Sequence, residues 1–175
     1  MKSETLKILS EEHQNILKII KILENECDAI ENGKELDKDF FEKVIEFIRN
    51  YADKFHHAKE EDILFLELNK PNIEMPCNPV EQMLIEHNEG RGFVKGMEKR
   101  LNERDKIRVI RNARAYADLL KKHISKEDDI LYPMADKALN NKIKKEILKK
   151  FKEIEKERKK DKTKYLNMIK EFKNR

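Results

Sequence analysis

Apolar residues recur every three or four positions along four long segments of the chain. In the first segment this spacing runs from Leu6 to Ile30, and His13 lies on the same stripe. The spacing predicts an amphipathic α-helix whose apolar face packs inside a bundle. Gly33, which tolerates the backbone angles of a helix end, is expected to terminate this helix.

The second segment repeats the pattern and carries two polar residues, His56 and Glu60, among its apolar positions. Asp37 or Asp39 can cap this helix, which is predicted to run to about Leu68. The next stretch is predicted to be a loop because it contains three prolines, Pro71, Pro76 and Pro79.

Two further helices are predicted on the same grounds. The third covers Val80 to Leu101 and includes His87, and the fourth covers Val109 to Met134 and includes His123 and Glu127. Four helices joined by short loops favour an all-α fold, the up-down-up-down four-helix bundle.

The last part of the chain is predicted to form an additional C-terminal helical segment that packs its apolar edge on the bundle. That edge contains Ile143, Ile147, Phe151, Ile154, Tyr165, Ile169 and Phe172. A break is expected near Asp161 to Thr163. We therefore divide the chain into a bundle, residues 1–139, and a basic C-terminal extension, residues 140–175.

Composition narrows the class of protein. Charged residues make up 42% of the chain and Trp is absent, which fits amphipathic helices with densely charged outer faces. Every apolar run is interrupted well before the ~18 residues that a membrane helix needs, so no membrane partner is expected. Cys27 and Cys77 are the only cysteines, and with no signal peptide they indicate reduced thiols in a cytoplasmic protein.

The formal charge of +4 is unevenly distributed along the chain. Residues 140–175 contain 15 Lys and Arg against 6 Asp and Glu, whereas residues 1–139 contain 24 against 29. A basic segment can contact nucleic acid or an anionic surface. Here the acidic residues are interspersed and no aromatic residues alternate with the basic ones, so a solvated helix is expected and a nucleic-acid partner is not.

Candidate chemistry lies in two similar segments, HHAKEEDILF beginning at His56 and HISKEDDILY beginning at His123. In each, a Glu follows the His four residues later, and residues four apart share a face of a helix. At a rise of about 1.5 Å per residue, His13 and His56 both lie about 25 Å from the turn that joins their helices. His87 and His123 likewise lie at similar distances from the turn that joins their two helices. One layer of the bundle can therefore hold four His and two Glu.

The six residues of this layer are His13, His56, Glu60, His87, His123 and Glu127. Burying two unpaired carboxylates would be costly, which favours a metal site over a purely structural cluster. Six nitrogen and oxygen donors exceed the four of tetrahedral zinc and suit iron, or less well manganese. Two ions about 3.5–4 Å apart, bridged by the glutamates, would use all six donors and leave room for an oxo or hydroxo bridge, water or a small ligand.

These residues resemble the hemerythrin-like family, whose HHE domains present H, HxxxE, H and HxxxE from four successive helices. The resemblance covers roughly Leu6 to Leu139, in the segments EEHQNI, FHHAKEEDILF, EHNEGR and KHISKEDDILYPMAD. It implies a non-haem di-iron centre held by the six residues named above.

The chain departs from the oxygen-carrying hemerythrins in two ways. Those proteins have a fifth histidine four residues from another on the third helix, where this chain has Met83 and Arg91 around His87. They also place an Asp five residues after the last His. That residue is Asp128 here, but the internal repeat of the chain favours Glu127 as the ligand. A reactive or sensing centre is therefore expected rather than a simple oxygen carrier.

Other residues near the layer are expected to have minor roles. His57, rotated about 100° from the preceding residue on a helix, is expected at the surface or behind the ligands. Tyr116 is expected in the core, with a hydroxyl behind the ligands as the alternative. Gly90 is expected to allow close packing, with access for a diatomic ligand as the alternative. Three acidic residues are expected on solvated helix faces, namely Glu61, Glu86 and Glu89.

These observations predict a cytoplasmic di-iron protein that binds, senses or consumes O2, peroxide or NO, with a redox partner if it turns over. Both an enzyme and a binding protein fit the sequence. Iron storage or donation, and regulation through the basic extension, are the alternatives.

Overall fold

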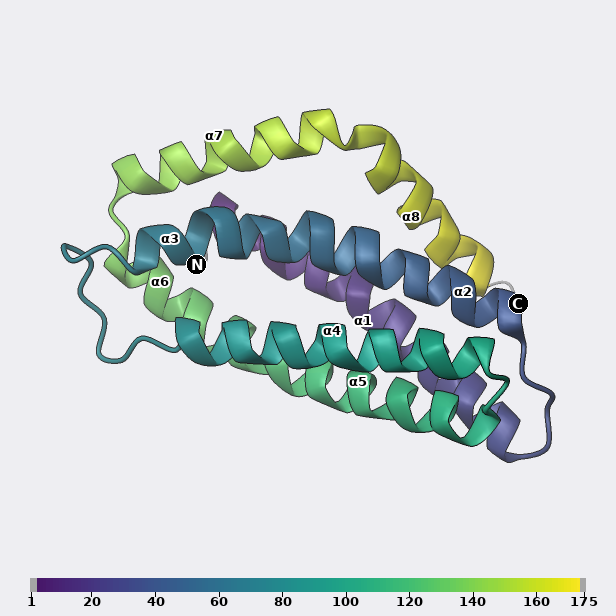
Figure 1. Ribbon diagram of the computed structural model, residues 1–175. Coiled ribbons are helices and arrows are strands. Elements are labelled where there is room, and N and C mark those ends of the chain that lie inside the picture. The colour runs from purple at the N-terminus through teal and green to yellow at the C-terminus, as the bar shows by residue number, and fades with distance from the viewer. Residues whose placement is uncertain (1–2, 174–175) are drawn as a thin grey trace.

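Figure 1 shows a computed structural model of the protein, in which residues 3–173 are described. These residues form helices and the turns that join them, without a strand. Four long helices run side by side and alternate in direction. The predicted all-α, up-down-up-down bundle is therefore confirmed.

The first long helix is α1 (Glu4–Glu31) and the third is α4 (Val80–Asn102). The second consists of α2 (Lys38–Phe47), η1 (Ile48–His57), η2 (Glu60–Leu64) and α3 (Phe65–Leu68). The fourth consists of α5 (Lys106–Lys126), η3 (Glu127–Leu131) and α6 (Tyr132–Ala138). The η segments are π-helical, with wide turns closed by i→i+5 hydrogen bonds that are typical of functional sites.

The first three long helices begin and end close to the predicted residues, whereas the fourth runs from Lys106 to Ala138 and so exceeds the predicted Val109 to Met134 at both ends. Gly33 follows α1 with a φ of 103°, a left-handed angle that glycine adopts without strain. Asp37 caps α2 by accepting a hydrogen bond from the Phe40 amide at 3.0 Å, and Asp105 caps α5 through the Arg108 amide at 3.1 Å. These caps fix the start of each helix and hence the height of its residues in the bundle.

The apolar core is divided into two clusters by a layer of polar side chains. The larger cluster joins Ile16–Ile30 of α1 to the buried residues of α2, η1, α5 and the C-terminal half of α4. The smaller one joins Leu6 and Leu9 to the buried residues of η2, α3, α6 and the start of α4. His13 lies between the two clusters, and so do the two HxxxE segments. The layer is therefore sealed by hydrophobic packing on both sides.

The C-terminal extension folds into two helices, α7 (Asn141–Glu157) and α8 (Lys159–Lys173). They lie along one side of the bundle and contact α1 and the second long helix (Figure 1). Ile147 and Phe151 join the smaller cluster, whereas Tyr165 and Ile169 join the larger one. The predicted packing of the apolar edge is confirmed.

The break in this extension lies at Arg158, a few residues before the predicted position. Thr163, which was expected at the break, lies inside α8 and donates its hydroxyl to the Lys159 carbonyl at 3.0 Å. The hydroxyl thus bonds to the backbone of its own helix, an arrangement that a helix interior tolerates at a small cost.

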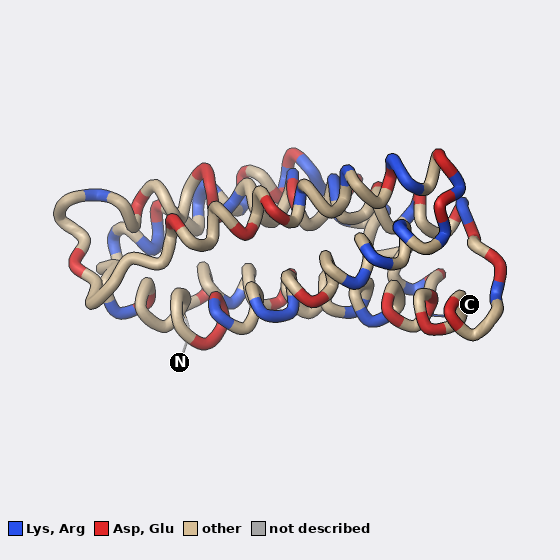
Figure 2. Tube along the Cα trace, turned by 60° about the horizontal axis from the view of Figure 1, so that its bottom comes forward, with Lys and Arg blue, Asp and Glu red and all other residues tan. Residues whose placement is uncertain are grey.

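Acidic and basic residues are interspersed along the helices of the bundle (Figure 2). No helix of the described part is both long and apolar enough to cross a membrane. Both cysteines are free thiols, with Cys27 buried in the core and Cys77 exposed in the loop before α4.

Candidate metal centre

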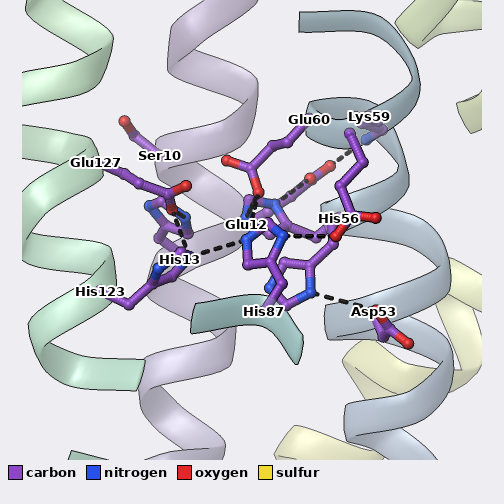
Figure 3. A network of polar contacts seen from close by, with 12 residues as sticks. Ser10, Glu12, His13, Asp53, His56, Lys59, Glu60, His87, His123 and Glu127 are labelled. Atoms are coloured by element: carbon purple, nitrogen blue, oxygen red, sulfur yellow. Dashed lines mark hydrogen bonds and ion pairs between the residues drawn. The ribbon is translucent and has the colours of Figure 1, made fainter. Parts of the chain in front are cut away.

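All six predicted ligands meet in the polar layer, one histidine from each long helix (Figure 3). Each is at most 2% exposed: His13, His56, Glu60, His87, His123 and Glu127. The HxxxE glutamates each begin a π-helical segment, η2 and η3. The layer therefore brings together from four helices what the sequence presents as four separate motifs.

Each glutamate lies between histidines from different halves of the bundle. One carboxylate oxygen of Glu60, Oε2, is 3.6 Å from Nε2 of both His56 and His87. In the same way, Oε2 of Glu127 is 3.2 Å from Nε2 of both His13 and His123. The two carboxylates thus connect the α1–η1 half to the α4–α5 half of the bundle.

Several atoms at the centre of the layer are buried without a hydrogen-bond partner in the described part of the protein. They are Nε2 of His56, Oε2 of Glu60 and both carboxylate oxygens of Glu127. A buried polar atom without a partner costs about 1–3 kcal/mol, and more if it is charged. A cation among these donors would remove that cost, so the residues fit a metal.

Donor atoms in the layer form two groups in which every atom lies within 4.8 Å of the others. One group consists of His13, His56, Glu60 and Glu127. The other consists of His57, His87 and His123, and it borders both glutamates. The arrangement has room for two metal ions rather than one.

His57 does not lie at the surface, which was one of the two positions expected for it. It is buried, and its ring stacks on that of His87 with 3.8 Å between the centroids. Its Nδ1 lies 3.3 Å from the Asp53 carboxylate, which leaves Nε2 for a metal. The prediction assumed an α-helix, but in the π-helix η1 consecutive side chains are rotated less about the axis, so that His56 and His57 both face inward.

Four acidic residues contact the four predicted histidine ligands at Nδ1, the ring nitrogen that faces away from the centre of the layer. Glu12 lies 3.0 Å from Nδ1 of His56 and Glu86 lies 2.9 Å from Nδ1 of His123. The two remaining pairs are Glu61 with Nδ1 of His87 at 2.6 Å, and Asp128 with Nδ1 of His13 at 3.1 Å. A carboxylate at Nδ1 fixes the tautomer and the orientation of an imidazole and directs Nε2 to the metal.

Two of these contacts show that predictions from the sequence were wrong. Glu61 and Glu86 were expected on solvated faces, yet both bond to site histidines across a helix interface. Asp128 bonds to Nδ1 of His13, on the side of the ring away from the centre, whereas Glu127 lies at Nε2. This arrangement supports the choice of Glu127 as the ligand in preference to Asp128.

The lysine of each HxxxE segment anchors one of the supporting acids. Lys59 donates to Glu12, and Lys126 donates to Glu86. Lys59 is fully buried, covers the Phe55 ring at 3.8 Å and lies 3.4 Å from Glu155 of α7. Lys126 is 38% exposed. The C-terminal extension therefore covers the pair of Lys59 and Glu12 but not the otherwise similar pair of Lys126 and Glu86.

The hydroxyl nearest to the centre belongs to Tyr132. It donates to Glu60 and stacks its ring on His13 with 5.5 Å between the centroids. Tyr116 was the alternative expected for this role, but it precedes His123 by two helical turns and lies in the core. The contact of Tyr132 was not predicted, because its position after the HxxxE segment does not indicate that its side chain points to the centre of the layer.

Burial and the neighbouring charges shift the pKa values of the donors in opposite directions. Burial, with the neighbouring Glu127 carboxylate, raises the pKa of Glu60 well above its usual value. Burial acts on Glu127 in the same direction, but His123 and His13 outweigh it and hold the pKa of Glu127 well below its usual value. Burial and the neighbouring His13 lower the pKa of His56, which keeps this imidazole neutral and able to bind a metal.

Comparison with known proteins gives one match. The family model described as the hemerythrin HHE cation binding domain matches residues 4–135. These residues include the whole polar layer and all four long helices up to α6. No curated protein and no solved structure matches the chain.

Proposed function

The chain belongs to the hemerythrin HHE cation-binding domain family, and from this membership and the geometry of the layer we propose that it holds two iron ions to bind, sense or consume O2, peroxide or NO. The observation that carries the proposal is the position of the glutamates. Each glutamate has one carboxylate oxygen that is equally far from a histidine of the α1–η1 half and from a histidine of the α4–α5 half of the bundle. A carboxylate in that position would serve as a ligand to both ions of a two-metal site.

The donor set favours iron over zinc. It offers imidazole nitrogens and carboxylate oxygens and no sulfur, and it exceeds the four ligands that structural zinc takes. When bound, an iron pair supplies or accepts the electrons that the chemistry of O2, peroxide or NO requires. The residues of the chain hold the ligands in place, and an apolar cluster packs on the layer from each side along the bundle.

His57 supplies the fifth imidazole that the sequence lacks on the third helix. At the position where oxygen carriers have that histidine, Arg91 instead bonds to Asp53, the acid that holds His57. The second donor group therefore has three imidazoles, and the first has two. This imbalance leaves the two ions in different surroundings, which suits a centre that binds a small ligand at one of them.

The test of the proposal is the metal content of protein purified without air. We expect two irons per chain and a new absorption band when air is admitted, because an open iron pair reacts with O2. A single zinc per chain, or no metal after growth with ample iron, would contradict the proposed centre. Turnover is measured separately, by following peroxide or NO consumption against enzyme concentration. Adduct formation without turnover would leave a binding or sensing role.

Replacing His57 tests the assignment of the second ion. In His57→Ala we expect about half of the iron to be lost, since the group of His13 and His56 keeps all its donors while the other group loses one of three imidazoles. Lys54→Ala, in the same π-helical segment but exposed, is the matched control and should keep all its iron. Full iron content in His57→Ala would show that His57 is not a ligand.

A further inference from the structure

The second donor group lies beside a cavity of about 480 Å³, whose walls come from η1, α4 and α5. Two of its histidines, His57 of η1 and His87 of α4, line this cavity together with Arg91. Side chains in a close-packed interior are held by neighbours on all sides, and a cavity removes some of these neighbours. The two imidazoles therefore depend on polar contacts to keep one orientation.

Arg91 of α4 contacts two acids of the second long helix at once. Its Nη2 lies 2.6 Å from Oδ1 of Asp53 in η1 and 2.8 Å from Oε1 of Glu61 in η2. Its Nε donates a further bond to Oδ1 of Asp53 at 2.9 Å, and its Nη1 donates to the Asn88 side chain at 3.1 Å. These four bonds fix the plane of the guanidinium and join α4 to both π-helical segments.

The two carboxylate oxygens that accept from this guanidinium also hold the two histidines. Oδ1 of Asp53 lies 3.3 Å from Nδ1 of His57, and Oε1 of Glu61 lies 2.6 Å from Nδ1 of His87. The two rings stack on each other with 3.8 Å between their centroids and 14° between their planes. One side chain is therefore connected, through two acids, to two imidazoles that lie face to face.

The third histidine of the group has a separate support. His123 is held by Glu86, to which Lys126 donates. A lysine suffices there because it serves one acid. Arginine suits the position of Arg91, since its planar fork can donate to two carboxylates at once, whereas an ammonium group is a point donor.

We propose that Arg91 is the positioning residue of the second donor group: it fixes the tautomer and the orientation of His57 and His87 together, and thereby sets the affinity of this group for a metal ion. A carboxylate at Nδ1 keeps the proton on that nitrogen and leaves Nε2 for the metal. The affinity rests on the proposed two-metal centre, whereas the state of the two rings can be measured without a metal.

The chain contains a matched control for this role. Arg49 of η1 pairs with Glu98 of α4 through two bonds of 2.5 and 2.7 Å, and both residues line the same cavity. The side chains of Arg49 and Arg91 are similarly exposed, at 41% and 37%. Among residues 3–173, no histidine bonds to either member of the pair of Arg49 and Glu98. Arg49→Ala therefore removes a comparable ion pair between the same two segments without touching the donor group.

Titration of the metal-free, full-length protein with Co²⁺, followed by visible absorption in competition with a chelator, measures the affinity of each ion. In Arg91→Ala we expect the second ion to bind at least tenfold more weakly, since loss of such a support costs about 10–100-fold in metal affinity. Arg91→Lys should recover part of this loss, and Arg49→Ala should bind both ions as the wild type does. In protein that already carries Asp53→Asn and Glu61→Gln, Arg91→Ala should have little further effect, because the arginine acts through these acids.

Nitrogen-15 NMR of the imidazole rings in the metal-free protein provides a second measurement. Burial lowers the pKa of His57 and of His87, so both rings are neutral at pH 7. Each should show a single tautomer, protonated at Nδ1, in the wild type and in Arg49→Ala. In Arg91→Ala we expect a mixture of tautomers at both rings.

Two results of the titration would overturn the proposal. One is equal affinity for the second ion in the wild type and in Arg91→Ala. The other is equal weakening in Arg49→Ala and Arg91→Ala, which would show that any ion pair across the cavity serves. If the wild type binds fewer than two ions, the proposed metal centre fails and the NMR spectra decide. A single unchanged tautomer at both rings in Arg91→Ala would then overturn the role of Arg91.

Discussion

Glu60→Ala is expected to remove iron from the protein and to lower its melting temperature by about 10–15 °C. Glu60 is fully buried and lies between His56 and His87, so in the proposed centre its loss would take a ligand from both ions. A protein that loses a ligand present at ~1,000 times its dissociation constant loses about 4 kcal/mol of stability. For a chain of this size each kcal/mol corresponds to about 2–4 °C. Iron analysis and thermal unfolding followed by circular dichroism measure the two effects on the same sample.

Two comparisons separate loss of metal from loss of packing. Asp62→Ala, two residues further along η2 and exposed, should keep both iron and melting temperature. Glu60→Gln keeps the acceptor for the Tyr132 hydroxyl but cannot ionise to the carboxylate that a metal ligand requires. It should therefore lack iron and yet be at least as stable as wild-type protein stripped of iron. Iron content equal to the wild type in Glu60→Ala would rule out this centre.

Helix number, order and caps were predictable because each depends on residues close together in the chain. The stripes of apolar residues and the cap at Asp37 are local signals. The common height of the histidines followed from counting residues from the turn that joins each pair of helices. The π-helical segments were not predicted, because a wide turn has no residue pattern of its own. The surface position considered for His57 was wrong for that reason.

The four acids that hold the histidines were missed, although the sequence contains a signal for them. A Glu directly precedes each single histidine, as Glu12 and Glu86, and an acid directly follows each HxxxE motif, as Glu61 and Asp128. The pattern repeats in both halves of the chain, as the ligands do. Helical periodicity tells which residues face a neighbour but not which neighbour they meet. Each acid supports a histidine of another helix, so the pairs became visible only in three dimensions.

The two halves of the bundle differ where the C-terminal extension covers one of them. Lys59 and Lys126 occupy the same position of the repeat and make the same contact to a supporting glutamate. Only Lys59 is sealed, by Phe55 and by the α7 residues Phe151 and Glu155. An ion pair in water contributes about 0–1 kcal/mol, whereas breaking a buried one costs about 3–5 kcal/mol. The same substitution should therefore have different effects in the two halves.

Lys59→Ala is expected to destabilise the protein by about 3–5 kcal/mol, because it leaves Glu12 buried without its cation. Lys126→Ala is the matched control built into the repeat, and its expected cost is about 1 kcal/mol or less. Chemical denaturation of both variants, each with iron bound and removed, measures the difference. Lys59→Ala should also bind iron more weakly, since Glu12 orients His56, and adding Glu12→Gln should recover part of the lost stability. Equal losses in the two lysine variants would show that covering by α7 gives Lys59 no special role.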